Sequence, residues 1–506
     1  MKFIALLINI QYFLIYCKYF LYFTLFLNVL LINTLFYKVT NSYSNFLAIA
    51  LYKTINLNGC VLIKFIQWIL SNIELLDLNL NKFIIELFSN VYENCYVHSL
   101  AYSKSIFKKE FNCSFDDVFE ILNANNANNA NNTNNGNNTI KSGSIAQIYC
   151  CKIKNSDLLN IDISNIKNKF AVKIVHPEIA FQITFPKYFI RLYSFMVKNI
   201  FFLKKYDTIF DCNNFFVNVE NQANMNIEYA NNKYYYEEYL NNKIFIIPKP
   251  ILSSNNILIL EYIEGYKLDE LNISDFEKQK IVALMSLFCK NNYLYLEYFH
   301  ADLHDSNWKI IYENNIYKII IYDFGYFIHN RFREFFKKLT LYIDTNNLEL
   351  ISGLMYDSIT NVEISKTDFT DNFINYLNKQ YSMYNSVNLT KYIYKFCYIN
   401  KYYTEKNLFE VFISLLLLKK HIDKYIFISS NTNHSYSYIL KINTFYNSLC
   451  KKYNIFNNIK NFIYENYITN KLFTEHIKYN NDHFDNLNHQ LSDDESSDNE
   501  NLNIDI

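Results

Sequence analysis

The first 37 residues are almost entirely apolar, and Lys2 and Lys18 are their charged side chains. Residues 19–37 carry no charge and are flanked by Lys18 and Lys38. A helix of this length and composition is long enough to cross a bilayer. We therefore expect a single-pass N-terminal membrane anchor. A removable signal peptide, a mitochondrial transit peptide and a helix packed on the domain are the alternatives.

Beyond this segment the hydrophobic pattern changes period along the chain. Residues 308–322 read as two strands joined by the polar turn 313–315, which predicts a β-hairpin. From about residue 331 to 470, apolar residues recur at spacings of three and four, as in 408–422, which predicts helices. The pattern predicts an α+β chain with a mainly helical C-terminal part.

Two segments lack the apolar residues that a packed core requires. One is the Asn-rich tract at 123–139, and the other is the acidic tail at 480–506. Neither segment can bury enough apolar surface to offset the entropy lost on folding. We expect both to be disordered, and the Asn-rich tract to project from the surface as an insertion.

Composition narrows the functional classes. The chain carries 48 Lys and Arg against 48 Asp and Glu, and its arginines are Arg191, Arg331 and Arg333. A nucleic-acid interface needs clustered basic side chains, so we expect no nucleic-acid partner. The 10 cysteines form no Cys-x-x-Cys pair, which disfavours zinc and thiol-redox sites.

Three short segments carry the residue types of phosphoryl transfer in the order found in kinases. They are AVK at 171–173, FHADLHDSN at 299–307 and DFG at 323–325. A kinase needs a strand lysine for the ATP phosphates, an aspartate that orients the nucleophile, and an Asn and Asp for magnesium. Lys173, Asp302, Asn307 and Asp323 are the candidates, and the interval from Asp302 to Asn307 is that of the kinase catalytic loop.

These segments together resemble the UbiB-type atypical kinases, the activity-of-bc-one-complex-like family, over roughly residues 59–327. That family has the catalytic segment Phe-His-Ala-Asp-x-His-x-Gly-Asn, and residues 299–307 match it with Ser306 in place of the glycine. The resemblance implies ATP and magnesium as cofactors.

Residues 142–149 (SGSIAQIY) resemble the alanine-rich nucleotide loop of this family. The resemblance implies that backbone groups of the loop cover the ATP phosphates. The implied nucleotide contacts are Ser142, Gly143, Ser144, Ile145 and Ala146. By composition alone the segment is a polar turn between two strands.

The segment at 64–67 (KFIQ) resembles the family's Lys-x-Gly-Gln signature, which lies on an added helix that folds over the active site. The resemblance implies that Lys64 and Gln67 lie near the nucleotide. Ile66 replaces the glycine, and glycine's missing Cβ is what permits a close backbone approach. A lysine and a glutamine on an ordinary amphipathic helix are the alternative.

Glu228 matches the glutamate that pairs with the strand lysine in kinases, here Lys173. Two acidic positions that precede this glutamate in the family are the amides Gln222 and Asn224. The charge that those carboxylates supply in relatives is therefore missing.

Residues 258–265 resemble the hinge strand that faces adenine in kinases. The resemblance implies nucleotide contacts at Glu261 and Ile263. By composition alone the segment is an apolar strand and a turn, and its place between Glu228 and Asp302 supports the hinge interpretation.

The resemblance implies a two-lobed, protein-kinase-like α+β fold with an N-terminal helical extension and a mainly helical C-terminal lobe. The expected parts are the anchor 1–38, the extension 54–122, the insertion 123–139, the N-lobe 140–265, the C-lobe 266–479 and the tail 480–506.

The implied function is an MgATP-binding atypical kinase or ATPase. Family members are tied to ubiquinone or other isoprenoid-lipid metabolism, which implies a lipid or isoprenoid ligand, a membrane and, by analogy, a mitochondrial location. The extension occupies the region where a peptide would dock, so a protein substrate is disfavoured. Residues 66, 222, 224 and 306 depart from the family motifs. The alternative is therefore a nucleotide-binding pseudokinase that acts as a regulator or scaffold.

A metal hydrolase is a further alternative, because the cluster His300, Asp302, His304 and Asp305 could by itself bind metal ions. That interpretation gives no role to Lys173 or to the DFG segment. In the kinase interpretation the two histidines orient the loop.

Overall fold

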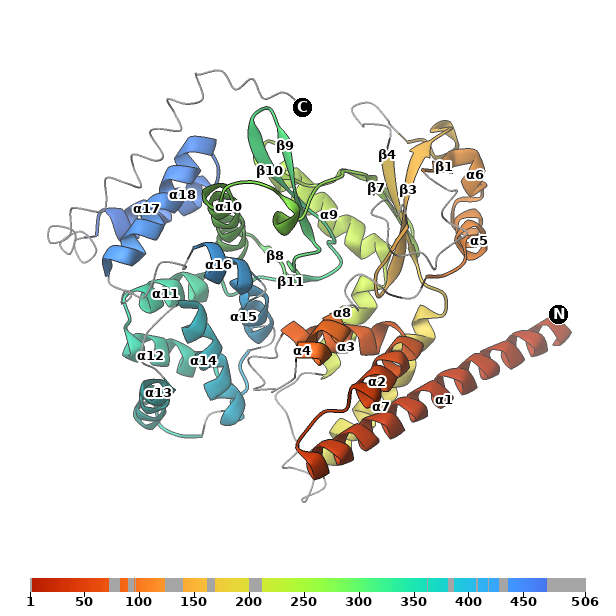
Figure 1. Cartoon of the computed structure of the whole chain (residues 1–506), viewed down its shortest axis with the longest axis horizontal. Helices are drawn as coiled ribbons and strands as arrows, with labels where there is room; N and C mark the ends of the chain where they lie inside the picture. Colours follow the sequence, from red (N-terminus) through yellow and green to blue (C-terminus); the bar gives the residue numbers. More distant parts are fainter. Residues whose placement is uncertain are drawn as a thin grey trace. The chain divides into compact units, whose positions relative to one another are not determined.

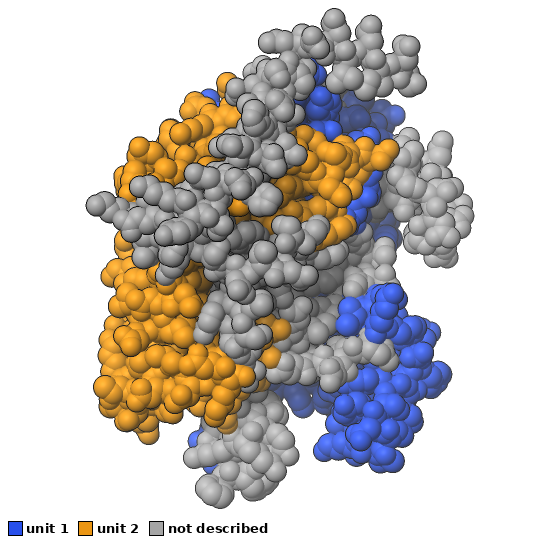
Figure 2. Space-filling view, turned by 60° about the vertical axis from the view of Figure 1, so that its left-hand side comes forward, with its two compact units in different colours: residues 1–241, 245–270, 300–327 blue, residues 242–244, 271–299, 328–506 orange. Residues whose placement is uncertain are grey.

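The computed structural model describes residues 2–71, 82–89, 95, 97–122, 140–161, 169–199, 212–361, 363–380, 386–405, 408–416, 418–426 and 436–470. The Asn-rich tract and the acidic tail lie outside these residues, so the disorder expected there stays a prediction. The chain divides into two compact units, which Figure 2 colours separately. Unit 1 comprises residues 1–241, 245–270 and 300–327, and unit 2 comprises residues 242–244, 271–299 and 328–506.

Unit 1 contains a six-stranded antiparallel sheet with the order β1-β3-β4-β7-β6 and with β2 paired to β3. The strands are β1 (Phe119–Ile121), β2 (Ile140–Ser142), β3 (Ala146–Ile153), β4 (Lys169–Val175), β6 (Pro250–Ser253) and β7 (Ile257–Glu261). In β4, alternation sends Phe170, Val172 and Ile174 into one apolar cluster. Lys173 therefore faces the opposite side of the sheet.

Helices cover both faces of this sheet (Figure 1). Helices α5 (Leu100–Phe111) and α6 (Phe115–Val118) lie on one side and α9 (Met225–Tyr239) lies on the other, whereas α7 (Ile179–Asn199) packs on α8 (Cys212–Gln222), which leads to α9. Phe107 and Phe115 pack with Phe170 on one face. Phe216 and Met225 pack with Leu258 on the other face, which is the face of Lys173.

The N-terminal helices form a separate layer of unit 1. They are α1 (Lys2–Thr40), α2 (Asn45–Asn58), α3 (Cys60–Ser71) and α4 (Lys82–Ser89). Phe23 of α1 packs into an apolar cluster with Ile55 of α2 and Leu62 of α3. Its ring centroid also lies 4.8 Å from that of Phe189 on α7. One face of α1 is therefore packed against other helices of unit 1.

Within the described residues, α1 is the one helix that is long and apolar enough to cross a membrane, over residues Ile10–Thr40. An 18-residue window within this stretch has a mean hydropathy of 1.8. Length and composition alone support the expected anchor, and the core helix of a soluble protein or a signal sequence can meet the same criterion.

A second sheet of unit 1 confirms the predicted hairpin. Strands β9 (Trp308–Glu313) and β10 (Ile316–Ile321) pair antiparallel, and β5 (Phe245–Ile246) lies parallel to β10. The connecting residues Asn314 and Asn315 both have positive φ, as the tight turns of two-residue hairpins require.

Unit 2 is mainly helical, as the spacing of apolar residues predicted. Its helices are α10 (Asp275–Leu294), α11 (Arg333–Asp344), α12 (Leu348–Ser358), α13 (Lys366–Gln380), α14 (Ser386–Ile399), α15 (Leu408–Leu416), α16 (Lys419–Tyr425), α17 (Tyr436–Tyr453) and α18 (Asn457–Ile463). The side chain of Asn330 donates hydrogen bonds to three carbonyls at the end of α10. Short strands β8 (Tyr298–His300) and β11 (Phe327–His329) flank the predicted catalytic and DFG segments. The α+β class is confirmed.

Candidate active site

A buried ion pair joins the sheet of unit 1 to α9. The ammonium of Lys173 lies 2.8 and 2.7 Å from the two carboxylate oxygens of Glu228. Asn224 caps α9 by accepting a hydrogen bond from the backbone N–H of Asn226, which places Glu228 in the first turn. The pairing predicted for Lys173 and Glu228 is thus present in the structure.

Asp323 lies beside the same lysine, with its Oδ1 atom 3.4 Å from the Lys173 ammonium. Its φ of 56° is in the left-handed region, which aspartate tolerates better than most residues do. Its Oδ1 atom also accepts a 3.4 Å hydrogen bond from the N–H of Gly325. The turn thus directs the Asp323 carboxylate towards Lys173.

Electrostatics keep Lys173 and Asp323 ionised. Burial alone would lower the pKa of Lys173, but the carboxylates of Asp323 and Glu228 outweigh it and hold the pKa well above its usual value. Burial also opposes ionisation of Asp323, yet Lys173, Lys64 and His304 hold its pKa well below the usual range. Since the Asp323 side chain is 41% exposed, water weakens the burial effect there. Burial raises the pKa of Glu228, and Lys173 opposes that shift.

The loop between β8 and β9 carries Asp302 and Asn307. The amide nitrogen of Asn307 donates a 2.6 Å hydrogen bond to the backbone carbonyl of Asp302, which leaves its Oδ1 atom as the one suited to a cation. The backbone carbonyl of Asn307 accepts from the N–H of Tyr322 at 2.8 Å. The hairpin thus brings Tyr322 back to Asn307, and Asp323 is the next residue after Tyr322.

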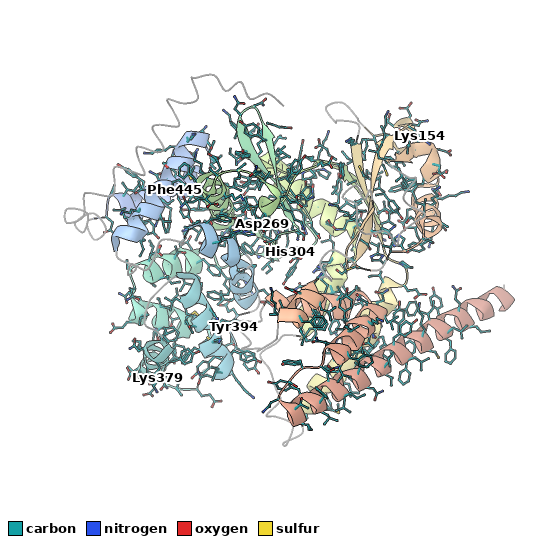
Figure 3. All side chains as sticks on the ribbon, in the orientation of Figure 1. Lys154, Asp269, His304, Lys379, Tyr394 and Phe445 are labelled. Carbon is teal, nitrogen blue, oxygen red and sulfur yellow. The ribbon has the colours of Figure 1, made fainter. Side chains whose placement is uncertain are left out.

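His300 orients this loop from the interior. It is fully buried, and burial lowers its pKa, so the imidazole is neutral. Its Nε2 atom donates to the carbonyl of Tyr322, and its Nδ1 atom accepts from the N–H of Asp302, both at 3.3 Å. His304, labelled in Figure 3, accepts at Nδ1 from the N–H of Ser306. Both histidines shape the loop.

Lys64 projects from α3 to the predicted catalytic aspartate. Its ammonium lies 3.5 Å from an Asp302 carboxylate oxygen, and the Lys64 side chain is 15% exposed. Gln67 follows three residues later on the same helix. Lys64, a predicted nucleotide contact, therefore contacts the predicted catalytic aspartate.

The predicted nucleotide loop connects β2 to β3. The N–H of Gly143 donates to the carbonyl of Ala146 at 3.0 Å, which closes a tight turn. Ile145 and Ala146 are buried in an apolar cluster, so their side chains serve the core. Any contact they make with a ligand would come from the backbone.

The predicted hinge lies at the end of β7. Glu261 pairs with Phe170 across the sheet, and its N–H donates to the carbonyl of Lys249 at 2.9 Å. The carbonyl of Ile263 accepts a 2.8 Å hydrogen bond from the Tyr322 hydroxyl. Tyr322 thus ties the hinge to the residue that precedes Asp323.

The residues that depart from the family motifs have local explanations. Ser306 does not adopt a positive φ, so its position does not require glycine. Ile66 packs against the apolar cluster of the N-terminal helices. Gln222 is buried with its Cγ atom near Gly325, and Asn224 is the N-cap described above. None of these replacements removes an atom of the Lys173, Glu228 and Asp323 group.

Two residues of the site were missed by the sequence analysis. The side chain of Asn231 donates a 2.9 Å hydrogen bond to the carbonyl of Phe324. The hydroxyl of Tyr235 accepts from the N–H of His300 at 3.2 Å. Both residues share the face of α9 that carries Glu228, at spacings of three and seven, and this helical spacing is the signal that could have identified them.

The hydrolase interpretation gains no support. In the described part of the chain, no group of three or more His, Cys, Asp or Glu side chains is arranged to hold a metal ion. Asn307 and Asp323, in contrast, offer the amide and carboxylate oxygens that suit magnesium. The chemistry of these two donors therefore fits magnesium.

Comparisons with known proteins agree with this description. The family model of the ABC1 atypical kinase-like domain matches residues 93–353. The search of curated proteins gave no match.

Solved structures that are similar to this chain include a Mycobacterium tuberculosis protein, Rv3197, in complex with erythromycin. It shows 15% identity and a TM-score of 0.41 over 65% of this chain and 83% of that chain. The Rio2 kinase of Chaetomium thermophilum, in an ADP/Mg²⁺-phosphoaspartate complex, shows 13% identity and a TM-score of 0.23 over 61% of this chain and 87% of its own. Another structure of that kinase shows 12% identity and a TM-score of 0.22 over the same shares.

The family model covers more than half of the 506 residues and includes every residue of the ion-pair group and of the catalytic loop. Lys64 and Gln67 precede the matched region. The chain belongs to the ABC1 atypical kinase-like family and has its kinase-like fold.

Proposed function

We propose that this protein is an MgATP-binding atypical kinase or ATPase of the UbiB type. The observation that carries the proposal is the contact of Lys173 with both Glu228 and Asp323. A lysine held between two carboxylates is positioned to bind phosphate, and one of these carboxylates is positioned to share a metal ion with that phosphate.

Each residue has a defined part in this proposal. Lys173 binds ATP phosphates and Glu228 positions it. Asp302 orients the attacking group, and His300 holds the Asp302 backbone through its Nδ1 atom. Asn307 and Asp323 hold magnesium, which when bound would neutralise charge on the transferring phosphoryl group.

The nucleotide itself would lie along the sheet of unit 1. We propose that the backbone at Glu261 and Ile263 meets the adenine and that the loop from Ser142 to Ala146 covers the phosphates. Lys64 and Gln67 would cover the site from α3. The contact between Lys64 and Asp302 supports this placement of the extension.

The phosphate acceptor that we propose is a lipid or isoprenoid rather than a protein. The support is the apolar surface of α1, where Phe13, Leu21 and Leu31 are each more than half exposed. Such a surface suits a membrane, and we propose that α1 anchors the protein there as a single span.

A vesicle experiment tests the anchor. Full-length protein is reconstituted into liposomes, which are floated, extracted at alkaline pH and treated with protease. Resistance to extraction with protected N-terminal residues supports a spanning helix. Release at alkaline pH would show that α1 lies on the surface, and failure to float would reject the membrane proposal.

A pseudokinase that acts as a scaffold is the second candidate, because one observation favours it. Lys64 contacts the aspartate that would orient the attacking group, so it could occupy this carboxylate permanently. In that case the protein binds nucleotide without turnover.

Thermal unfolding with and without ATP and magnesium tests the main proposal. We expect a magnesium-dependent rise in Tm, because a ligand at one hundred times its Kd stabilises the native state by about 2.7 kcal/mol. The rise should be lost in Lys173→Ala and Asp323→Asn. It should persist in Lys187→Ala, which removes a lysine paired with Glu220 on α7 and α8.

The outcomes separate the candidates. A Tm rise in the wild type accompanied by phosphate release supports the catalytic proposal, and labelling of lipid rather than protein supports the acceptor. A Tm rise without any turnover supports the pseudokinase. A folded wild type that does not respond to ATP rejects both.

A further inference from the structure

A chain of buried hydrogen bonds ends on the predicted nucleotide loop. We call it the His98–His176 relay. It comprises His98, Ser103 of α5, Gln147 and Tyr149 of β3, His176 after β4, and the carbonyl of Gly143. All five side chains are at most 4% exposed. None of them belongs to the ion-pair group or to the catalytic loop.

The donor and acceptor atoms of these groups determine which way each hydrogen bond in the relay is donated, starting from the Gly143 carbonyl. The Gly143 carbonyl can only accept, so His176 donates to it through Nε2 at 2.9 Å. A neutral His176 must then accept at Nδ1, and the donor is Nδ1 of His98 at 2.8 Å. His98 is left to accept at Nε2, from the hydroxyl of Ser103 at 2.7 Å.

At the other end of the relay, the hydrogen bonds of Ser103, Tyr149 and Gln147 are donated in the same direction. The Ser103 oxygen accepts from the Tyr149 hydroxyl at 2.7 Å. The Gln147 amide nitrogen donates to Tyr149 and to the carbonyl of His98, and its oxygen accepts from the N–H of His98 at 2.9 Å. One set of proton positions therefore satisfies every one of these contacts, and it requires both imidazoles to be neutral.

The surroundings favour these neutral forms. Burial, assisted by His176, lowers the pKa of His98 to about 3. Burial also lowers the pKa of His176, although the Gly143 carbonyl opposes this shift. At neutral pH the imidazoles thus carry the protons that the relay requires.

His176 holds the loop at three points, one of which is a 3.4 Å contact of its Nε2 atom with the Ser142 hydroxyl. Besides the side-chain bond to Gly143, its N–H donates to the carbonyl of Ile145 at 2.9 Å. The N–H of Cys95, in the segment that leads to His98, donates to the carbonyl of Ser142 at 3.4 Å. The carbonyls of Ser142, Gly143 and Ile145 are therefore held by donors of Cys95 and His176.

We propose that the His98–His176 relay positions the nucleotide loop, and that His98, Ser103 and Tyr149 are positioning residues for nucleotide binding. This proposal rests on the proposed function of the loop. Carbonyls repel phosphate and N–H groups attract it, so a relay that holds these carbonyls prepares the loop before the nucleotide arrives.

The imidazole tautomers test the relay without any nucleotide. In full-length protein labelled with ¹⁵N-histidine, we expect His98 to carry its proton at Nδ1 and His176 at Nε2 at pH 7. The resonances are assigned with His98→Asn and His176→Asn. Averaged tautomers or an imidazolium at either position would overturn the proposal.

Variants outside residues 142–146 test the positioning of this loop. Ser103→Ala removes the donor to His98, and Tyr149→Phe removes the donor to Ser103. Ser352→Ala is the matched control, because Ser352 is equally buried and bonds to Thr370 in unit 2. We expect faster hydrogen exchange at residues 142–146 and about threefold to tenfold weaker ATP binding in the first two variants, the effect of about one hydrogen bond. The control should change neither quantity.

The readouts distinguish failure of this proposal from failure of the proposed function. Unchanged hydrogen exchange in folded Ser103→Ala and Tyr149→Phe overturns the positioning role whatever the ATP result. Faster exchange with unchanged ATP affinity also overturns it, because the relay would then be structural only. Absence of ATP binding in the wild type rejects the proposed function and, with it, the role of the relay in nucleotide binding.

Discussion

The ammonium of Lys64 lies 3.5 Å from the carboxylate of Asp302, so the N-terminal extension reaches the loop that is predicted to be catalytic. Both side chains are largely buried. The charge of Lys64 also contributes to the low pKa of Asp323. A single lysine of the extension thus acts on the aspartates proposed for nucleophile orientation and for magnesium.

Replacement of Lys64 should release Asp302. In Lys64→Met we expect ATP hydrolysis to rise about threefold to tenfold, because a partly buried ion pair of about 1 kcal/mol no longer competes for the carboxylate. Steady-state phosphate release measures this change. Lys82→Met, which removes an equally long but exposed pair with Glu86, is the control and should have no effect. An unchanged or lower rate in Lys64→Met would contradict the expected competition of Lys64 for the Asp302 carboxylate.

Replacement of Glu228 should lower activity more than stability. In Glu228→Gln the side chain keeps its shape and one hydrogen bond to Lys173 but loses its charge. We expect kcat/KM for ATP to fall by about a hundredfold, the cost of misplacing a catalytic group by about 1 Å. Glu237→Gln on the same helix, whose exposed carboxylate lies 3.9 Å from Lys233, is the control. Wild-type kinetics in a folded Glu228→Gln protein would exclude the ion pair from catalysis.

Stability should fall as the pH is lowered below about 6.5. The unfolded chain binds a proton at each histidine below this value, whereas the folded protein keeps His98, His176 and His300 neutral because burial lowers their pKa. The native state then binds fewer protons, so the free energy of unfolding decreases, and the contribution of His98 is lost fully only near its folded pKa of about 3. The low pKa of Asp323 acts in a separate window, because its contribution is lost only below about pH 4.

Urea unfolding at pH 7.5 and pH 5 measures this effect. His98→Asn should reduce the difference between the two pH values. His329→Asn, at a position whose side chain is 58% exposed, should leave the difference unchanged. Equal stability of the wild type at both pH values would contradict the neutral histidines.

Two glycines should respond differently to alanine. A Cβ atom at Gly265 would lie 3.0 Å from side-chain atoms of both Ile320 and Lys309 and 3.1 Å from a carbonyl oxygen. We expect Gly265→Ala to destabilise the protein by about 1–3 kcal/mol through overpacking. At Gly143 the nearest atom would lie at 3.6 Å, so Gly143→Ala should leave stability almost unchanged. Thermal unfolding measures the Tm of the two variants. Equal Tm values would show that the neighbours of Gly265 can move to accommodate a Cβ atom.

The family and the hairpin were predictable from the sequence because they depend on local order. The residues 299–307 and 323–325 identify the chain by type and interval, and the turn at 314–315 is a short-range signal. The pairing of Lys173 with Glu228 also followed, because the family motif names both partners.

The remaining contacts depend on segments that meet only in the folded protein. No spacing in the sequence brings Lys64 to Asp302, or His98 to His176, because these partners are separated by sheets and helices of unpredictable packing. The same holds for Tyr322, whose hydroxyl reaches the carbonyl of Ile263. Sequence periodicity assigns a residue to a face of its own helix or strand. Tertiary packing determines which other element that face contacts.

The sequence by itself determined the α+β class, the helical C-terminal part and the order of the phosphoryl-transfer residues, since these follow from hydrophobic period and motif spacing. The tertiary structure alone decided that Lys64 contacts Asp302, that one face of α1 is packed on α7, and that His176, itself bonded to His98, holds the carbonyl of Gly143. The physical reason is that burial and long-range hydrogen bonds arise only when distant elements close around one another, and it is these contacts that set the charges and proton positions of the site.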